Sequence, residues 1–289
     1  MQEYEPPEDL IISLSGMRGI FGESLDPEVI LKFCQAFGSW LKEKLGKAPK
    51  ILVGMDPRTT GPMVKNVAIG ALLSIGAEIV DADLCPTPVL LFGHRYLDCD
   101  GTVIISASHN PPQYNGMKCL GPHGTFLGNE DLKEIDEFFL GKKNPLFAPW
   151  DEFKKVTIKS DLVGIYFENM KKHLDLQTFM NQTQKSHLRV IVDTGCGAGT
   201  GVTAKFLEEL GCDTIEINNE LMEDGTYPRM FEPTIEHLSK LEETINELGC
   251  DVAFAHDFDA DRVTLIGEKG QVYREDVIVA ILWKHVLQK

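Results

Sequence analysis

Two short stretches of this sequence gather side chains that can take part in chemistry. The first is "SASHNPPQYNGMK" at 106–118, which follows the apolar run "TVII" at 102–105. Ser108 stands just past that run, and His109 and Lys118 add positive charge or proton transfer beside its hydroxyl. Two prolines restrict the loop backbone and a glycine permits a tight return. The loop suits a serine presented to a ligand, and the alternative is a polar turn that only hydrogen-bonds its own backbone.

The second stretch is "HDFDADR" at 256–262, between two apolar runs. Its three aspartates, Asp257, Asp259 and Asp261, alternate along the chain, so their carboxylates can converge on one point in an extended or looping backbone. Three clustered anions repel each other without a cation. The pattern therefore favours a hard divalent cation bound through oxygen.

Two other interpretations of this acidic loop stay open. A calcium-binding EF-hand uses the same alternation of aspartates, and Glu268 falls at position twelve of such a loop. Position six, however, is Arg262 where an EF-hand needs glycine, and strands are expected on both sides where an EF-hand has helices. The remaining interpretation is a solvated acidic turn without an ion.

Two arginines lie in glycine-bearing segments: Arg18 in "SGMRGIFG" at 15–22 and Arg58 in "GMDPRTTG" at 54–61. A guanidinium with nearby backbone amides suits a phosphate, whereas an ion pair with a surface carboxylate is the more common role of a single arginine. A third segment, "DTGCGAGTG" at 193–201, does not match the dinucleotide pattern GxGxxG. We expect it to form a tight strand-to-helix turn.

The apolar pattern supplies a scaffold for these motifs. Asp26 as N-cap, a proline at the first helical position, a helical apolar period and a terminal Gly46 predict an amphipathic helix at 26–46. Apolar strands then alternate with helices, which indicates a mostly parallel sheet covered on both faces, with ligands at the carboxyl ends of its strands. The expected elements up to residue 140 are strands at 51–55, 78–84 and 102–106 and helices at 61–75, after Pro88 and at 129–140.

A glycine, two prolines and lysines at 141–150 are typical of a connector between domains, and a second α/β cycle follows it. The fold class is therefore α/β, with two consecutive three-layer α/β/α domains whose mixed sheets are mostly parallel. The predicted boundaries are 1–150 for the first domain, 151–270 for the second and 271–289 for a terminal helix. The expected elements of the second cycle are strands at 188–194, 213–217, 251–256 and 262–267 and helices near 201–210 and 235–248.

Composition excludes several classes of protein. With 289 residues, 43% apolar and 25% charged, the chain is an ordinary globular protein of about two domains. Its net charge of −16 argues against nucleic acid or an anionic membrane surface as partner, and no apolar run approaches the roughly 20 residues of a membrane helix. Seven cysteines without a CxxC pair are expected to be buried thiols in a reducing compartment. The expected location is the cytoplasm.

In this order and at these separations, "SGMRGIFG", "SASHNPPQYNGMK" and "DFDADR" resemble the motifs of the α-D-phosphohexomutases, which include phosphoglucomutases, phosphomannomutases and phosphoglucosamine mutases. The resemblance extends to "GMDPRTTG", "PTPVLLFG", "VDTGCGAG" and "DGTYPRMFEPTIEHL", so it covers essentially the whole chain. It implies the first two α/β domains of such an enzyme. The helix from Glu275 is similar to the start of a third domain, and in a truncated chain it would contact the missing domains or another chain.

The resemblance also implies a reaction. Ser108 would carry a phosphoryl group, and Asp257, Asp259 and Asp261 would hold Mg²⁺ together with a phosphoserine oxygen. Phosphate would move between O1 and O6 of a hexose phosphate through a hexose 1,6-bisphosphate. Four further positions match family residues that line this site: Arg18, His109, Lys118 and Arg262.

His109 and Lys118 would then serve proton transfer or charge stabilisation, and Arg18 and Arg262 would meet the phosphoryl group or the metal loop. Two features depart from the family. Phe258 stands where the family usually has glycine, and a positive φ at that position would cost about 1 kcal/mol or more. The chain also stops where a third domain would begin, so we expect little or no mutase turnover from these residues alone.

Two other functions remain open. The chain could be a non-catalytic phosphosugar- or metal-binding relative that has lost the reaction, which Phe258 mildly favours and which Ser108, Lys118 and the three aspartates argue against. It could also be a subunit whose cleft is completed by another chain through the apolar C-terminal helix. The resemblance does not select among glucose, mannose and glucosamine phosphates.

Overall fold

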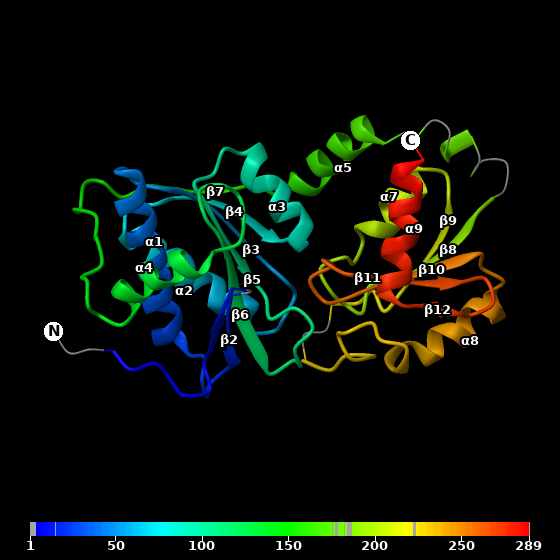
Figure 1. Ribbon diagram of the computed structural model, residues 1–289, viewed down its shortest axis with the longest axis horizontal. Helices are drawn as coiled ribbons and strands as arrows, with labels where there is room; N and C mark the ends of the chain where they lie inside the picture. The colour runs from blue at the N-terminus through cyan, green and yellow to red at the C-terminus, as the bar shows by residue number, and fades with distance from the viewer. Residues whose placement is uncertain are drawn as a thin grey trace. The chain divides into compact units, whose positions relative to one another are not determined.

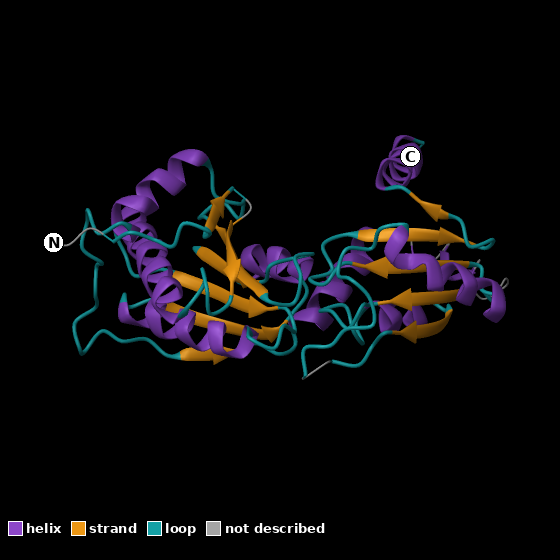
Figure 2. Cartoon of the chain, turned by 90° about the horizontal axis from the view of Figure 1, so that it is seen from below, coloured by secondary structure: helices purple, strands orange, loops and turns teal. Residues whose placement is uncertain are grey.

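The computed structural model describes residues 4–288 except 15, 175, 177–178, 182, 184–186, 222 and 223. The chain divides into two compact units, Met1–Val163 and Gly164–Lys289 (Figure 1). Each unit is an α/β sandwich with one mixed sheet, and Figure 2 shows the strands of each unit gathered into a sheet with helices beside it. The division lies after β7 (Val156–Ile158), which pairs with the first sheet although it follows the predicted boundary at 150.

The first sheet has seven strands in the order β1-β2-β6-β5-β3-β4-β7. Strands β5, β3, β4 and β7 pair in parallel, whereas the pairs that join β1, β2, β6 and β5 are antiparallel. The carboxyl ends of β3 and β5 therefore meet at one edge, where ligands of α/β sheets bind. The strands not yet bounded are β1 (Ile11–Ser13), β2 (Gly16–Ile20), β3 (Lys50–Met55), β4 (Glu78–Leu84), β5 (Gly101–Ile105) and β6 (Tyr114–Leu120).

Helices cover both faces of this sheet. Ile51 and Val53 of β3 point into a core shared with α1 (Pro27–Leu45), α2 (Gly61–Ser74) and α4 (Asn129–Phe139). The alternate residues of β3 meet the opposite layer, because a Cβ added at Gly54 would touch Leu90 of α3 (Thr87–Tyr96). The predicted three-layer arrangement is confirmed for this unit.

The predicted ends of α1 are also confirmed. The Asp26 carboxylate accepts hydrogen bonds from the backbone amides of Glu28 and Val29, at 2.8 and 2.9 Å, and so caps the first turn. At the other end Gly46 adopts the left-handed conformation with φ 66°.

The second sheet has five strands in the order β12-β11-β10-β8-β9. Strands β10, β8 and β9 are parallel, and β11 and β12 are antiparallel to their neighbours. Ile191 of β8 packs into a core with α8, and Val190 and Val192 pack into a second core with α7 on the opposite face. The strands are β8 (Arg189–Asp193), β9 (Asp213–Ile217), β10 (Val252–His256), β11 (Val263–Gly267) and β12 (Val272–Tyr273), and the helices are α5 (Leu162–His173), α7 (Thr203–Glu209), a 3-10 turn η1 (Glu236–Leu238), α8 (Ser239–Leu248) and α9 (Glu275–Leu287).

Helix α9 differs from the other described helices because none of its residues is buried. Its exposed apolar side chains include Ile281, Leu282 and Trp283. Within the described residues no helix is long and apolar enough to cross a membrane.

Gly116 allows β2 and β6 to pair closely. A Cβ added there would lie 2.2 Å from the Met17 carbonyl oxygen, which is backbone and cannot turn aside. We expect Gly116→Ala to lower the free energy of unfolding by about 3 kcal/mol, because the strands must separate locally. Urea unfolding followed by circular dichroism measures this. Gly70→Ala is the matched control, since a Cβ in that exposed turn of α2 meets nothing within 4 Å and should stabilise the helix. Equal stability of both variants would contradict the prediction.

Candidate functional site

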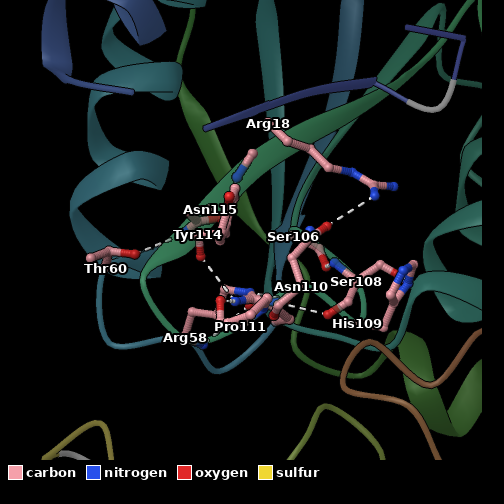
Figure 3. Close-up of polar contacts among 12 residues, drawn as sticks. Arg18, Arg58, Thr60, Ser106, Ser108, His109, Asn110, Pro111, Tyr114 and Asn115 are labelled. Atoms are coloured by element: carbon pink, nitrogen blue, oxygen red, sulfur yellow. Dashed lines mark hydrogen bonds and ion pairs between the residues drawn. The ribbon is translucent and has the colours of Figure 1, made fainter. Parts of the chain in front are cut away.

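The serine loop, residues 106–115, runs from the end of β5 through the first two residues of β6, at the edge where the parallel strands end (Figure 3). Ser108 has φ 52°, in the left-handed region that residues with a Cβ rarely adopt. Its backbone amide donates a hydrogen bond of 2.8 Å to the hydroxyl of Ser106, which is fully buried. The predicted placement of Ser108 just beyond a strand end is thus observed.

His109 and Arg18 lie beside the serine. The Ser108 hydroxyl is 3.4 Å from Nδ1 of His109, at the long end of hydrogen-bond range. The Arg18 guanidinium, from β2, donates to the Asn110 side-chain oxygen at 3.1 Å and so lies over the same loop (Figure 3). The structure therefore places an imidazole beside the serine hydroxyl and a guanidinium over the same loop, two residues along the chain at Asn110.

Lys118 lies inside β6, two residues after Gly116, and is buried. Gly116 pairs with Arg18 across β2, and Lys118 pairs with Ile104 across β5. Directly opposite residues share a face of a sheet, and so do residues two apart on one strand. Arg18 and Lys118 therefore lie on the same face, and their two positive charges counter the acidic net charge locally.

Arg58 has neither of the two roles expected from its sequence context. Its guanidinium is buried, pairs with buried Asp56 at 3.2 Å and donates to backbone carbonyls of the serine loop. The reason lies in topology: Asp56 directly follows β3, which is next to β5, so the segment after β3 runs under the loop after β5. Sequence reasoning did not single out Asp56.

The acidic loop, residues 257–261, connects β10 to β11 in the second unit. Each aspartate, Asp257, Asp259 and Asp261, offers a carboxylate oxygen, and these oxygens lie within 4.8 Å of one another. Asp257 and Asp259 are buried and Asp261 is exposed. Burial, and then the charges of Asp259 and Asp261, raise the pKa of Asp257 to about 7. The predicted convergence of the three carboxylates is confirmed.

This donor set fits a hard divalent cation, because its oxygens converge and its charges repel each other without one. Arg262 offsets part of the charge: its backbone amide and Nε donate to Asp257 at 2.9 and 3.2 Å, and its Nη1 donates to Glu232 at 3.1 Å. The EF-hand interpretation is wrong, since antiparallel strands flank the loop.

Phe258 does not have a positive φ; the residue of this loop that does is Ala260, at 57°. Phe258 is buried and stacks on Phe231 with ring centroids 3.9 Å apart, and it meets Tyr227 edge-on at 5.3 Å. Phenylalanine at this position therefore anchors the acidic loop in the core, and the strain considered from the sequence does not arise there.

Glycine in place of Phe258 is therefore expected to destabilise the folded chain. We expect Phe258→Gly to lower the free energy of unfolding by about 4 kcal/mol, because a buried aromatic ring is removed and a cavity is left. Chemical denaturation measures the change. Met230→Ala, at a half-exposed position near Phe231 in the sequence, is the control and should cost less than about 1 kcal/mol. Equal costs would show that the ring stack contributes nothing.

The segment "DTGCGAGTG" forms the predicted strand-to-helix turn, between β8 and α7. It packs against the acidic loop: the Ala198 amide donates to the Phe258 carbonyl at 2.8 Å, and a Cβ at Gly197 would lie 2.5 Å from that oxygen. Asp193, at the end of β8, holds Arg229 at 2.9 Å, and Arg229 donates to the His256 carbonyl at 2.6 Å. Sequence reasoning missed both residues of this pair.

Comparison with known proteins agrees with this architecture. Residues 10–145 match the family model of phosphoglucomutase/phosphomannomutase α/β/α domain I, and residues 165–270 match domain II. A putative phosphomannomutase from Thermus thermophilus has a similar structure, with a TM-score of 0.83 and 26% identity, covering 98% of this chain and 62% of that chain.

Two relatives from Thermococcus kodakarensis are each 36% identical to this chain over 275 residues, or 95% of it. One is a phosphoglucomutase/phosphomannomutase, of which the match covers 59%, and the other a phosphopentomutase, of which it covers 57%. A probable phosphoglucosamine mutase from Pyrococcus horikoshii is 34% identical. The chain thus spans less than two thirds of these relatives, and it belongs to the phosphoglucomutase/phosphomannomutase family, of which it contains α/β/α domains I and II.

Proposed function

We propose that this chain carries the phosphoserine and metal-binding parts of a phosphohexomutase, which moves a phosphoryl group between O1 and O6 of a hexose phosphate. The observation that carries the proposal is the Ser108 hydroxyl, which lies just beyond a strand end and 3.4 Å from Nδ1 of His109, in a loop whose Asn110 side chain binds Arg18. A serine in left-handed backbone is uncommon, and such strain is concentrated at functional sites. Membership of a mutase family makes phosphoryl transfer the matching chemistry.

In the proposed cycle the bond between phosphorus and Ser108 Oγ breaks as a sugar hydroxyl oxygen bonds to phosphorus. The proton of that hydroxyl passes to His109, and Ser108 leaves as an alkoxide that the nearby positive charges, including that of Lys118, stabilise. The sugar bisphosphate then turns around. Its other phosphoryl group returns to Ser108, and a proton goes back to the sugar oxygen, so no net phosphate is consumed.

Two arginines, Arg18 and Arg262, would stabilise negative charge, the first on the transferring phosphoryl group and the second on the acidic loop. Arg18 lies over the serine loop and is placed to meet the equatorial oxygens of the transferring group, where a guanidinium can bind two oxygens at once. Arg262 would keep the acidic loop in shape through its three hydrogen bonds to Asp257 and Glu232. Asp257, Asp259 and Asp261 would hold Mg²⁺. The bound cation would withdraw charge from the phosphoryl group during transfer.

The sugar of the substrate must be identified by experiment, because relatives that are equally identical to this chain are named for different sugars. A phosphopentomutase is as similar to this chain as a phosphoglucomutase/phosphomannomutase. A pentose phosphate is therefore a second candidate substrate class. The two classes share phosphoserine chemistry and differ in the distance between the two phosphates of the bisphosphate.

Intact mass spectrometry of the chain, incubated with Mg²⁺ and either a hexose 1,6-bisphosphate or a pentose 1,5-bisphosphate, tests the proposal. We expect a gain of about 80 Da, the mass of one phosphoryl group, mapped to Ser108 and faster with the hexose compound. Faster gain with the pentose compound would move the substrate class to pentoses. No gain with either, also after the remaining domains of a family member are added in trans, would favour the non-catalytic alternative.

A further inference from the structure

Four backbone carbonyl oxygens of the serine loop converge on the guanidinium of Arg58. Its Nη1 donates to the carbonyls of Pro111 and Tyr114, each at 2.9 Å. Its Nη2 donates to the carbonyls of Ser108 and Asn110, at 2.6 and 2.8 Å (Figure 3). One side chain thus contacts the loop at four positions between Ser108 and the first residue of β6.

The charge of this arginine is balanced beneath the loop. Its Nε donates to Asp56 Oδ2 at 3.2 Å, and the other oxygen of that carboxylate accepts from the Arg58 backbone amide at 3.1 Å. Both side chains are completely buried. A guanidinium has five N–H donors, and the carboxylate and the four carbonyls take all five, so Arg58 is built into the protein and does not face substrate.

Other hydrogen bonds of the loop each hold it at one point. Its backbone forms two short-range turns, from the Asn110 amide to Ala107 and from the Tyr114 amide to Pro111. The Phe21 amide donates to the Gln113 carbonyl, and the Arg18 side chain donates to the Asn110 side chain. Carbonyl groups buried without a donor cost free energy, so the donors of Arg58 stabilise the inward orientation of these four carbonyls, of which that of Pro111 also accepts from the Tyr114 amide. The direction of the Ser108 carbonyl then helps to hold Ser108 in its left-handed conformation, which sets where the hydroxyl points.

We propose that Arg58 is a positioning residue that holds Ser108 in its reactive orientation. Its effect on the reaction rests on the proposed function, whereas its effect on the loop does not. The second unit repeats the arrangement: a carboxylate at a strand end, Asp193, holds Arg229, which donates to the carbonyl of His256, directly before the acidic loop. In both units an aspartate at the end of one parallel strand pairs with an arginine that supports the candidate loop of the neighbouring strand, although Arg58 follows the same strand as Asp56 and Arg229 comes from the segment after β9.

Only arginine suits this position. Lysine keeps the positive charge beside Asp56, but its three donors share one nitrogen and cannot reach carbonyls spread around a planar guanidinium. Arg58→Lys therefore separates loop positioning from simple charge balance. Leu72→Ala is the matched control: Leu72 is a buried residue near the far end of α2 in the same unit, and its loss destabilises the core without touching the loop.

Two measurements on the full chain test the proposal. Hydrogen exchange by mass spectrometry follows the amides of residues 106–115, and time-resolved intact mass follows phosphoryl uptake from a hexose 1,6-bisphosphate. For Arg58→Lys we expect exchange in the loop to rise about tenfold or more beyond that in Leu72→Ala. We also expect the uptake rate at saturating bisphosphate to fall about 100-fold, with the half-saturating concentration changed less than about threefold.

The proposal would be overturned if hydrogen exchange in the serine loop of Arg58→Lys were no greater than in Leu72→Ala. An unchanged rate of phosphoryl uptake would also overturn it. A large rise in the half-saturating concentration alone would show that Arg58 binds the ligand, which also overturns it. If Arg58→Lys fails to fold, the double variant Asp56→Asn/Arg58→Met removes both buried charges and undergoes the same measurements. If the unsubstituted chain takes up no phosphoryl group, the proposed function fails, and the exchange comparison still decides the role of Arg58.

Discussion

Replacing Ser108 with alanine is expected to abolish the gain of about 80 Da from a sugar bisphosphate, lowering phosphoryl uptake by at least about 1,000-fold. The Ser108 hydroxyl is the proposed acceptor, and the loop places it within 3.4 Å of an imidazole nitrogen. Alanine removes the acceptor but keeps the backbone bonds of residue 108 to Ser106 and Arg58, which involve its amide and carbonyl. The loop should therefore keep its shape while its chemistry is lost.

Quantitative intact mass measures this effect, and phosphopeptide mapping assigns the site. Ser74→Ala is the control, because Ser74 ends α2 and hydrogen-bonds Ala71 and Gln35, away from the loop. It should take up phosphate like the unsubstituted chain. Uptake by Ser108→Ala on another residue at the unsubstituted rate would remove Ser108 from the proposed mechanism.

The second large effect concerns Mg²⁺ and pH at the acidic loop. The folded chain without cation holds the pKa of Asp257 at about 7, against 3.8 for an ordinary aspartate, through burial and then the charges of Asp259 and Asp261. A raised carboxyl pKa means that the folded state binds more protons than the unfolded state between these values. Stability of the metal-free chain should therefore fall as pH rises from about 4 to about 7.

The size of this loss is at most about 4 kcal/mol, the equivalent of the full pKa shift. Mg²⁺ bound as proposed would compete with the proton for the same oxygens, so its stabilising effect should grow over the same pH range and level off above about pH 7. Thermal unfolding with and without millimolar Mg²⁺, repeated across this range, measures the effect. If the stabilisation by Mg²⁺ did not change across this pH range, the ion would bind at a site other than the acidic loop.

Asp257→Asn should remove this behaviour. The amide keeps an oxygen to accept from the Arg262 backbone amide but carries no charge, so the metal-free chain becomes more stable near neutral pH and loses most of its response to Mg²⁺. Asp213→Asn is the control at an exposed aspartate of β9, and it should leave the response unchanged. Equal responses to Mg²⁺ in both variants would contradict the assignment of the acidic loop.

Much of the fold could be predicted because local chemistry determined it. The Asp26 cap, the following proline and Gly46 defined α1, and apolar runs defined the central strands of both sheets. Both candidate loops could be found because each follows an apolar run with polar residues at a strand end. The convergence of Asp257, Asp259 and Asp261 could also be predicted, since alternation along a short loop brings side chains together without help from distant residues.

Strands with mixed composition were missed. β6 contains Asn115 and Lys118, both buried, together with Gly116, so its sequence does not alternate between apolar and polar residues. It is a strand because β2 and β5 pair with it on either side, a condition set by residues about ten to a hundred positions away. Pairing between distant segments overrides local preference in sheets.

The supports of the two loops were decided by tertiary structure alone. In the sequence, Arg58 is an arginine near an aspartate, and nothing nearby shows that four carbonyls of another loop will surround it. From the sequence, Phe258 suggests a strained backbone in the acidic loop. In the structure its ring stacks on Phe231 and anchors that loop in the core. The sequence by itself determined which residues can carry the chemistry, because reactivity belongs to side-chain type and short-range spacing. Only the tertiary structure decided how those residues are held, because the hydrogen bonds that hold them join segments whose proximity arises from the order of strands in each sheet.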